Sequence, residues 1–152
     1  MLKKIFTVLF CLSLITCLPT FAKGKAPEPT ALELRQMQTR SYEIKDKKEL
    51  MEAIVNVLQD RDYLINESSY NLGVISGYKE CKEGYRYVRY ETSVQINELK
   101  KDNYKVRTNF IKKNITPTGE TTTQIDVKNP EEFYREFFSQ LDKSLFIESQ
   151  GI

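Results

Sequence analysis

Apolar and polar side chains alternate strictly along the second half of the chain. The clearest run covers residues 88–96, where the alternating positions are Val88, Tyr90, Thr92, Val94 and Ile96. The same alternation recurs over 104–110 and 121–127, and a period of two is typical of strands with one buried face. Turn-forming segments at 99–103 and 116–120 separate the runs, which predicts consecutive antiparallel strands.

A further hairpin is predicted upstream, from a strand beginning at Tyr63 and a second strand over Leu72–Tyr78. Gly73 and Gly77 fall four residues apart and hence on one face, where we expect a helix to approach the sheet closely. The charged stretch 79–84 is expected to be a flexible connection. Alternation over 31–41 predicts a first strand with a bulge near Gln36.

Two segments follow a helical period instead. Asp46 and Glu49 have the spacing of a capping box, and the apolar side chains that follow share one face as far as about Asp60. Asn129 and Pro130 predict a second helix start, an N-cap followed by proline at the first helical position. Its apolar positions form an aromatic stripe, listed as Phe133, Tyr134, Phe137, Phe138, Leu141, Leu145 and Phe146.

The order of elements is strand, helix, four or five mainly antiparallel strands, helix. This order predicts a single two-layer α+β domain over 31–152, with a sheet of about five to six strands and two helices on one face. The length is that of one ordinary domain.

The N-terminus has the build of a secretory signal peptide over residues 1–22. Lys3 and Lys4 precede an apolar run to Leu18, too short to span a bilayer comfortably, and cleavage is expected after Ala22. Residues 23–30 then read as an extended tether. The alternative is processing of the signal peptide at Cys17, with lipidation of this cysteine, which would hold the protein at a membrane through a lipid anchor. We therefore expect a periplasmic or outer-membrane-associated location.

The charge and the cysteine content of the chain limit which classes of partner we expect. The chain has 23 basic and 21 acidic residues, and loss of Lys3 and Lys4 with the signal leaves 21 of each. A neutral chain argues against nucleic acid and against simple electrostatic binding to membranes. After cleavage Cys81 is the remaining cysteine, read as a loop residue rather than as an intermolecular disulfide or reactive thiol.

The residue types predict no catalytic site, metal site or cofactor. The chain has no histidine, which removes Ser-His and Cys-His nucleophile pairs and the commonest zinc ligand. The carboxylate pairs Asp60 with Asp62 and Glu131 with Glu132 lie at helix ends, where capping and helix-dipole effects explain acidic residues. No phosphate loop or calcium loop is present. We therefore expect a non-enzymatic protein.

One candidate interaction face combines tyrosine and arginine. Tyr85, Tyr87 and Arg89 interleave aromatic and basic side chains, a composition enriched at protein interfaces. Arg35 and Arg40 lie on opposite faces of an ideal strand, and a bulge could bring them together to bind an anionic group. Ordinary surface ion pairs with the abundant glutamates are the alternative for these two arginines.

Four segments resemble a family of small, uncharacterised bacterial envelope proteins, many of them lipoproteins. They are 34–40 (LRQMQTR), 57–60 (VLQD), 72–75 (LGVI) and 137–146 (FFSQLDKSLF). The resemblance implies location in the envelope more than activity. The chain departs from the family pattern at residues 61–63, and at Thr16, where such lipoproteins usually carry Gly, Ala or Ser before the cysteine. The second departure favours cleavage after Ala22.

Two functional hypotheses follow. The first is a non-catalytic envelope adaptor that binds an envelope protein partner. The second is a carrier of a small apolar or lipid ligand, held between the C-terminal helix and the sheet, in a cavity formed by Phe137, Phe138, Leu141 and the glycine-bearing hairpin.

Overall fold

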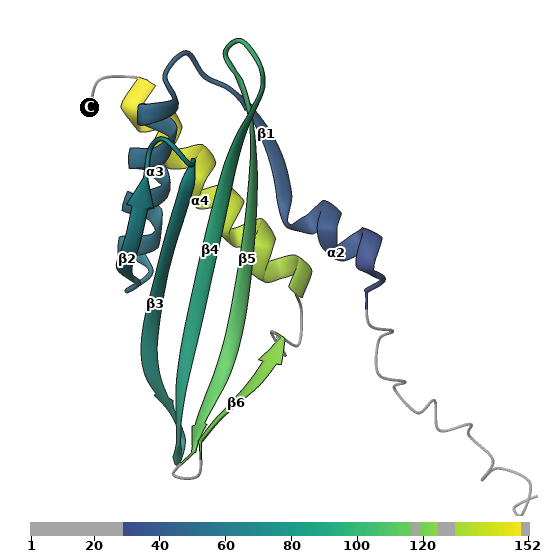
Figure 1. The fold of residues 1–152 in the computed structure, drawn as a ribbon, viewed down its shortest axis with the longest axis vertical. Coiled ribbons are helices and arrows are strands. Elements are labelled where there is room, and N and C mark those ends of the chain that lie inside the picture. Colours follow the sequence, from purple (N-terminus) through teal and green to yellow (C-terminus); the bar gives the residue numbers. More distant parts are fainter. Residues whose placement is uncertain (1–28, 117–118, 125–129, 150–152) are drawn as a thin grey trace, which may run out of the picture.

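Three helices and six strands make up the described part of this computed structural model, which covers residues 29–116, 119–124 and 130–149 (Figure 1). The elements are, in chain order, α2 (Ala31–Met37), β1 (Thr39–Glu43), α3 (Lys47–Asp60), β2 (Leu64–Ser69), β3 (Val74–Glu83), β4 (Arg86–Lys100), β5 (Asn103–Thr116), β6 (Gly119–Gln124) and α4 (Pro130–Ser149). The predicted α+β class is confirmed.

The strands form one antiparallel sheet in the order β1-β5-β4-β3-β2, with β6 also pairing with β5. Strands β1 and β6 lie along the same edge of β5, since β1 pairs with residues 103–107 and β6 with 111–116. Between them, no described strand pairs with β5 over 108–110. The long β4–β5 hairpin is the centre of the sheet, in agreement with its strict sequence alternation.

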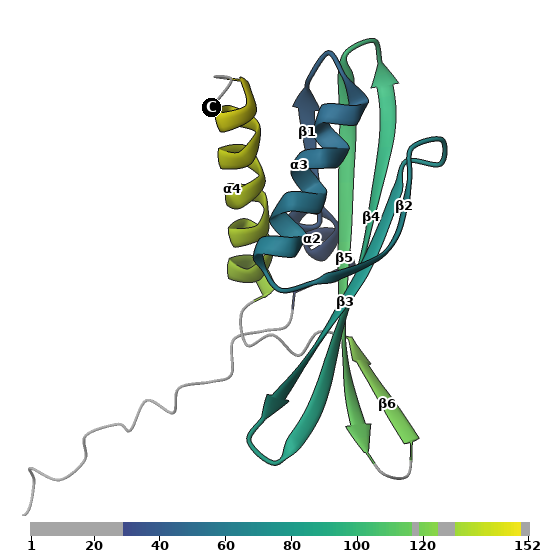
Figure 2. The same ribbon diagram turned by 90° about the vertical axis from the view of Figure 1, so that its left-hand side faces the viewer.

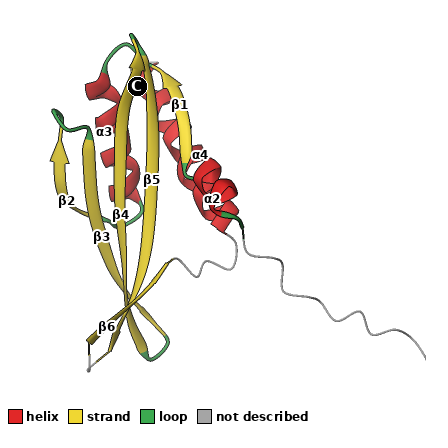
Figure 3. Cartoon of the chain, turned by 45° about the vertical axis from the view of Figure 1, so that its right-hand side comes forward, coloured by secondary structure: helices red, strands yellow, loops and turns green. Residues whose placement is uncertain are grey.

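The long helices α3 and α4 pack side by side on one face of the sheet, and no described helix covers the other face (Figures 2 and 3). Side chains from both helices and from alternate strand positions form the core beneath them. Phe110 lies at its centre and contacts the rings of Tyr63, Phe133, Tyr134 and Phe137. Of the predicted aromatic stripe, Phe146 is the exception, with 66% of its surface exposed.

The prediction of a single strand over 31–41 was wrong. Residues 31–37 form α2, and only Thr39–Glu43 form a strand. A capping box explains the helix: the Thr30 hydroxyl accepts a hydrogen bond from the Glu33 amide, and the Glu33 carboxylate accepts one from the Thr30 amide. The predicted capping box at Asp46 does not form, because the Asp46 carboxylate accepts from Lys48 rather than from Glu49, although α3 begins where expected.

Two further expectations for the β3 region were wrong. Residues 79–83 continue β3 rather than forming a flexible connection, and a turn at Gly84 leads into β4. Backbone, and not a helix, lies against the two glycines. A side chain at Gly77 would meet the Leu64 carbonyl oxygen at 2.8 Å, and Gly73 lies in a turn with φ of 64°, close to the Ile96 carbonyl.

Candidate functional site: the helix-free face of the sheet

The sheet surface opposite α3 and α4, called here the helix-free face, is built by the outward positions of the strands. Strand register places equivalent residues in rows across β3, β4 and β5, because directly paired residues point to the same side. One row is Tyr78, Glu91 and Ile111; a second is Ser76, Ser93 and Asn109; and a third is Glu80, Arg89 and Lys113. The face thus mixes aromatic, apolar and charged side chains.

Ion pairs run across this face between neighbouring strands. Arg89 donates from Nε to Glu80 Oε1 at 2.9 Å, and its guanidinium lies 5.2 Å from the ring centroid of Tyr78. Lys113 Nζ lies 2.8 Å from Glu91 Oε1. Because the two carboxylates are already paired with cations, the charges in this part of the face are largely neutralised internally.

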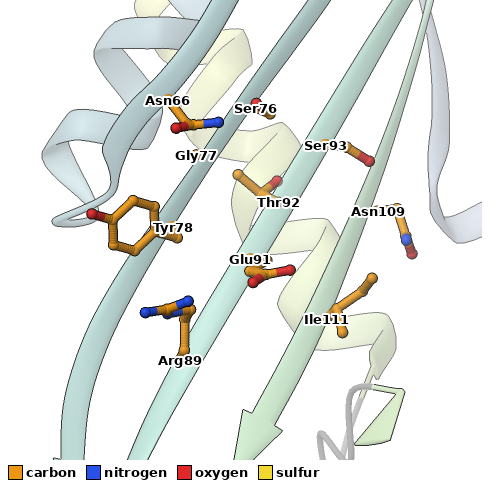
Figure 4. Close-up of a pocket in the computed structure, with 10 residues that line it drawn as sticks. All are labelled: Asn66, Ser76, Gly77, Tyr78, Arg89, Glu91, Thr92, Ser93, Asn109 and Ile111. Carbon is orange, nitrogen blue, oxygen red and sulfur yellow. The ribbon is translucent and has the colours of Figure 1, made fainter. Parts of the chain in front are cut away.

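A shallow hollow of about 420 Å³ lies over β2, β3, β4 and β5 (Figure 4). Tyr78 and Arg89 line it on one side and Asn109 and Ile111 on the other, with α4 behind the sheet. Leu64, which pairs with Tyr78 across β2 and β3, is 63% exposed beside it. The hollow therefore offers apolar and aromatic surface framed by paired charges.

A second hollow, of about 440 Å³, adjoins the first and shares Ser93 and Asn109 with it. Helix α2 forms one wall through Leu34 and Arg35, and Gln95 and Arg107 of the sheet form the other. In contrast to the first hollow, the described residues that line it include no aspartate or glutamate. We call it the α2 hollow.

Gln38 fixes α2 against the unpaired edge of β5. Its carbonyl accepts a hydrogen bond from the Thr108 amide at 2.9 Å, in the gap between β1 and β6. Its side-chain nitrogen donates to Asn109 Oδ1 at 3.2 Å and to Tyr134 Oη at 3.0 Å. Burial raises the pKa of Tyr134, and the hydrogen bond with Gln38 opposes that rise. This network joins α2, β5 and α4 at the rim of the α2 hollow.

The structure divides the residues predicted as an interaction face. Arg89 and Tyr87 occupy outward positions of β4, with Tyr87 60% exposed, and Tyr85 is fully exposed in the turn before β4. Arg35 lies on α2 at the other end of the helix-free face. Four of the five residues are thus on this face or at its margins.

Arg40 does not join Arg35, and the expectation that a bulge could unite them was wrong. Arg40 lies on β1 on the helix-covered side, where its guanidinium donates to Asp142 Oδ2 at 2.6 Å and stacks 5.0 Å from the ring centroid of Phe138. Tyr42 donates to the other oxygen of Asp142 at 3.0 Å. Burial, reinforced by Asp142, raises the pKa of Tyr42. Arg40 therefore ties β1 to α4.

Arg107 replaces Arg40 as the neighbour of Arg35, and the sequence reasoning missed it. The alternation of β5 does place Arg107 on an outward position, together with Asn109 and Ile111. The alternation of β5 does not predict the position of α2, and this position brings Arg35 to the same hollow as Arg107.

The side chains that the carrier hypothesis places around a ligand cavity are packed in the core between α4 and the sheet. Phe137, Phe138 and Leu141 are at most 2% exposed, and the ring centroids of the two phenylalanines are 5.2 Å apart. These side chains pack against one another and the sheet. Both hollows described above lie on the opposite face.

Several predicted features lie outside the described residues or concern exposed positions. The signal peptide, Cys17, Ala22, residues 23–28 of the tether and Asn129 are outside the described residues. Cys81 is exposed on β3 with a free thiol. Across the described ranges, no group of three or more acidic or cysteine side chains could hold a metal ion. None of the helices described in this chain is long and apolar enough to cross a membrane.

No family model matches the chain, and no curated protein matches it in sequence. Three solved structures resemble its arrangement of helices and sheet. The adenylate sensor from AMP-activated protein kinase, in complex with the ribofuranotide ZMP, is 14% identical over 70% of this chain and 94% of that chain, with a TM-score of 0.46. A DUF4468 family protein from Bacteroides ovatus is 11% identical over 81% and 91% of the two chains, with a TM-score of 0.43.

A TBP-like protein from Parabacteroides distasonis is 14% identical over 70% of this chain and 90% of that chain, with a TM-score of 0.38. These likenesses concern the α+β fold and assign no ligand or activity to this chain.

Proposed function

We propose that this chain is a non-catalytic binding protein of the bacterial cell envelope, which holds a protein partner on the helix-free face of its sheet. The observation that carries the proposal is the composition of that face. Exposed Tyr87 and Leu64, together with Tyr78 and Ile111, supply aromatic and apolar contact surface over four neighbouring strands. Tyrosine and arginine are the residues most often found at the energetic centre of protein interfaces.

The arrangement of charges favours a specific partner over a general polyanion. Glu80 and Glu91 are paired with Arg89 and Lys113, so desolvating this region would bury ion pairs already formed rather than isolated charges. A neutral mature chain would lack the long-range field that attracts nucleic acid or anionic lipid. Shape and short-range contacts would therefore determine recognition.

The envelope location in this proposal rests on the N-terminal sequence. Lys3 and Lys4, the apolar run that follows and the Thr20-Phe21-Ala22 exit are the parts of an export signal. The absence of histidine from the sequence supports the non-catalytic role.

Site-specific photo-crosslinking in the native cell envelope tests the proposal. A photoreactive amino acid would replace Tyr87 or Ile111 on the helix-free face, and Glu52 on the solvent side of α3 would serve as the matched control. We expect a discrete adduct of one protein at Tyr87 and Ile111 and none at Glu52. The purified adduct partner should then bind the isolated protein, and Tyr87→Ala should weaken that binding about tenfold or more.

Two outcomes would overturn the proposal. Adducts at Glu52 but not at the two sheet positions would place the interface on the helical layer. No discrete adduct at any position, with the protein folded and exported, would remove the adaptor role.

A further inference from the structure

The α2 hollow brings together two positive charges that no acidic side chain among the described residues neutralises. Arg35 and Arg107 both line it, and neither guanidinium forms an ion pair with a described residue. Two arginines of the sheet behave differently, since Arg40 binds Asp142 and Arg89 binds Glu80. Arg86, at the start of β4, also forms no ion pair with a described residue, but it does not line either hollow. Each guanidinium is planar and can donate two parallel hydrogen bonds to a carboxylate or a phosphate. Two guanidiniums at one hollow, neither in an ion pair with a described residue, therefore form a candidate binding site for an anion.

Neutral donors surround the two arginines. Asn109 accepts from Gln38 through Oδ1, so its amide nitrogen remains to donate elsewhere, and Asn109 lines the hollow. Ser93 and Gln95 add a hydroxyl and an amide from β4. Gln38 orients Asn109 and also donates to the buried Tyr134, so the position of Asn109 at the hollow is held by the core. A bound anion would therefore meet donors that are already positioned.

The wall of the hollow also has an apolar part. Ala31 and Leu34 of α2 line it beside Arg35. A hydrocarbon stem that ends in a charged oxyanion fits such a surface, with the stem against Leu34 and the oxyanion between the guanidiniums. The side chains of aspartate and glutamate have this form.

We infer that the α2 hollow binds a carboxylate of an acidic side chain presented by the protein partner, with Arg35 and Arg107 as its ligands. This inference rests on the proposed function, because it names one anchor point of the partner on the helix-free face. A carboxylate is favoured over a lipid phosphate because the two arginines form a local site on a chain whose 23 basic and 21 acidic residues nearly balance, whereas a membrane surface is recognised by clusters of basic residues.

The test uses the purified exported chain and a capped tripeptide, acetyl-Gly-Glu-Gly-amide, as the carboxylate probe. Amide chemical shifts in two-dimensional NMR are followed during titration, with acetyl-Gly-Gln-Gly-amide as the uncharged control. We expect saturable shifts at Arg35, Gln95, Arg107 and Asn109 with the glutamate peptide only. Arg35→Gln and Arg107→Gln should each raise the dissociation constant about tenfold, as expected for loss of a charge-assisted hydrogen bond.

Arg135→Gln is the matched control variant, because it removes the same charge from an exposed position on α4, in the opposite layer. It should leave the peptide titration unchanged. Equal loss of binding in Arg135→Gln would show that net charge, and not the hollow, attracts the peptide, and would overturn the inference.

Two parallel titrations, with inorganic phosphate and with phosphatidylglycerol vesicles, distinguish the source of the anion. Weaker effects than those of the glutamate peptide support the carboxylate assignment. Tighter binding of phosphate or vesicles that is lost in Arg107→Gln would overturn it in favour of a phosphate ligand. No localised shifts with any probe would remove the site altogether.

The inference and the proposed function can fail separately. A crosslinked partner whose affinity is unaffected by Arg35→Gln and Arg107→Gln would refute the anion site and leave the adaptor role intact. Localised peptide binding without a crosslinked partner would retain the site and refute the adaptor role.

Discussion

Replacement of Phe110 by alanine should be among the most damaging single changes in the described domain. Phe110 is 1% exposed, and its ring meets four others at centroid distances of 4.8 Å (Phe133), 5.5 Å (Phe137), 5.7 Å (Tyr134) and 6.1 Å (Tyr63). The ring therefore joins the central strand β5 to α4 and to the segment after α3. Its removal would leave a cavity at the centre of the core, between β5 and α4.

The expected loss follows from cavity formation and from the lost ring contacts. Phenylalanine-to-alanine changes in cores cost about 3 to 5 kcal/mol in free energy of unfolding. Edge-to-face aromatic pairs contribute about 0.5 to 1.5 kcal/mol beyond area burial, which places Phe110→Ala near the upper end of that range. Small domains have a total free energy of unfolding of roughly 5 to 15 kcal/mol, so the variant should be folded only marginally.

Urea unfolding followed by circular dichroism measures this loss. Ile111→Ala is the control, because the adjacent side chain points to the helix-free face and is only half-buried. Its cost should be much smaller, about 1 kcal/mol. Equal losses for the two variants would refute the assignment of the two faces. If Phe110→Ala does not fold, Phe110→Leu should show an intermediate loss, because it leaves a smaller cavity.

Three further changes probe buried polar groups. Tyr134→Phe removes the acceptor of the Gln38 amide and should lower the free energy of unfolding by about 1 to 3 kcal/mol in urea titrations; an unchanged midpoint would contradict the network. Thr108→Val should leave stability unchanged or raise it by up to about 1 kcal/mol, because the buried Thr108 hydroxyl has no hydrogen-bond partner among the described residues, and a clear loss would reveal one. Burial raises the pKa of Tyr63, so the folded state keeps this proton to higher pH than the unfolded state does. The resulting stability is complete below about pH 10 and declines as pH rises above it. Tyr63→Phe should therefore flatten the decline in the free energy of unfolding above about pH 10, and identical alkaline profiles for the two proteins would exclude Tyr63 as a source of that decline.

Local sequence chemistry predicted most elements and missed α2 for a specific reason. The alternation within 31–41 indicates a strand, but Leu34 and Met37 are three residues apart, a spacing that suits one face of a helix, and both pack against the core. The capping pair Thr30 and Glu33 was the other evidence available for the helix. The charged composition of 79–83 hid a strand, because β3 continues beyond the area covered by α3 and α4 and both its faces there are exposed. Burial patterns predict a strand only where burial exists.

The candidate site was predictable in part. Alternation assigned Arg89 and Tyr87 to one face of a strand, because side-chain direction in a strand depends only on local geometry. It could not place Arg35 and Arg107 at one hollow, because they are far apart in sequence. They line the same hollow because Gln38, Leu34 and Met37 hold α2 against β5 and the core.

The sequence by itself determined the α+β class, the helical faces and the strand faces, since these follow from periodicity and capping within a few residues. It also determined the small formal net charge of +2 and the absence of histidine. Only the tertiary structure decided that β1 and β6 share one edge of β5, that Arg40 pairs with Asp142, and that α2 forms one wall of a hollow that Arg107 also lines. The physical reason is that strand partners and ion pairs depend on which distant segments pack together, and local propensity does not encode that choice.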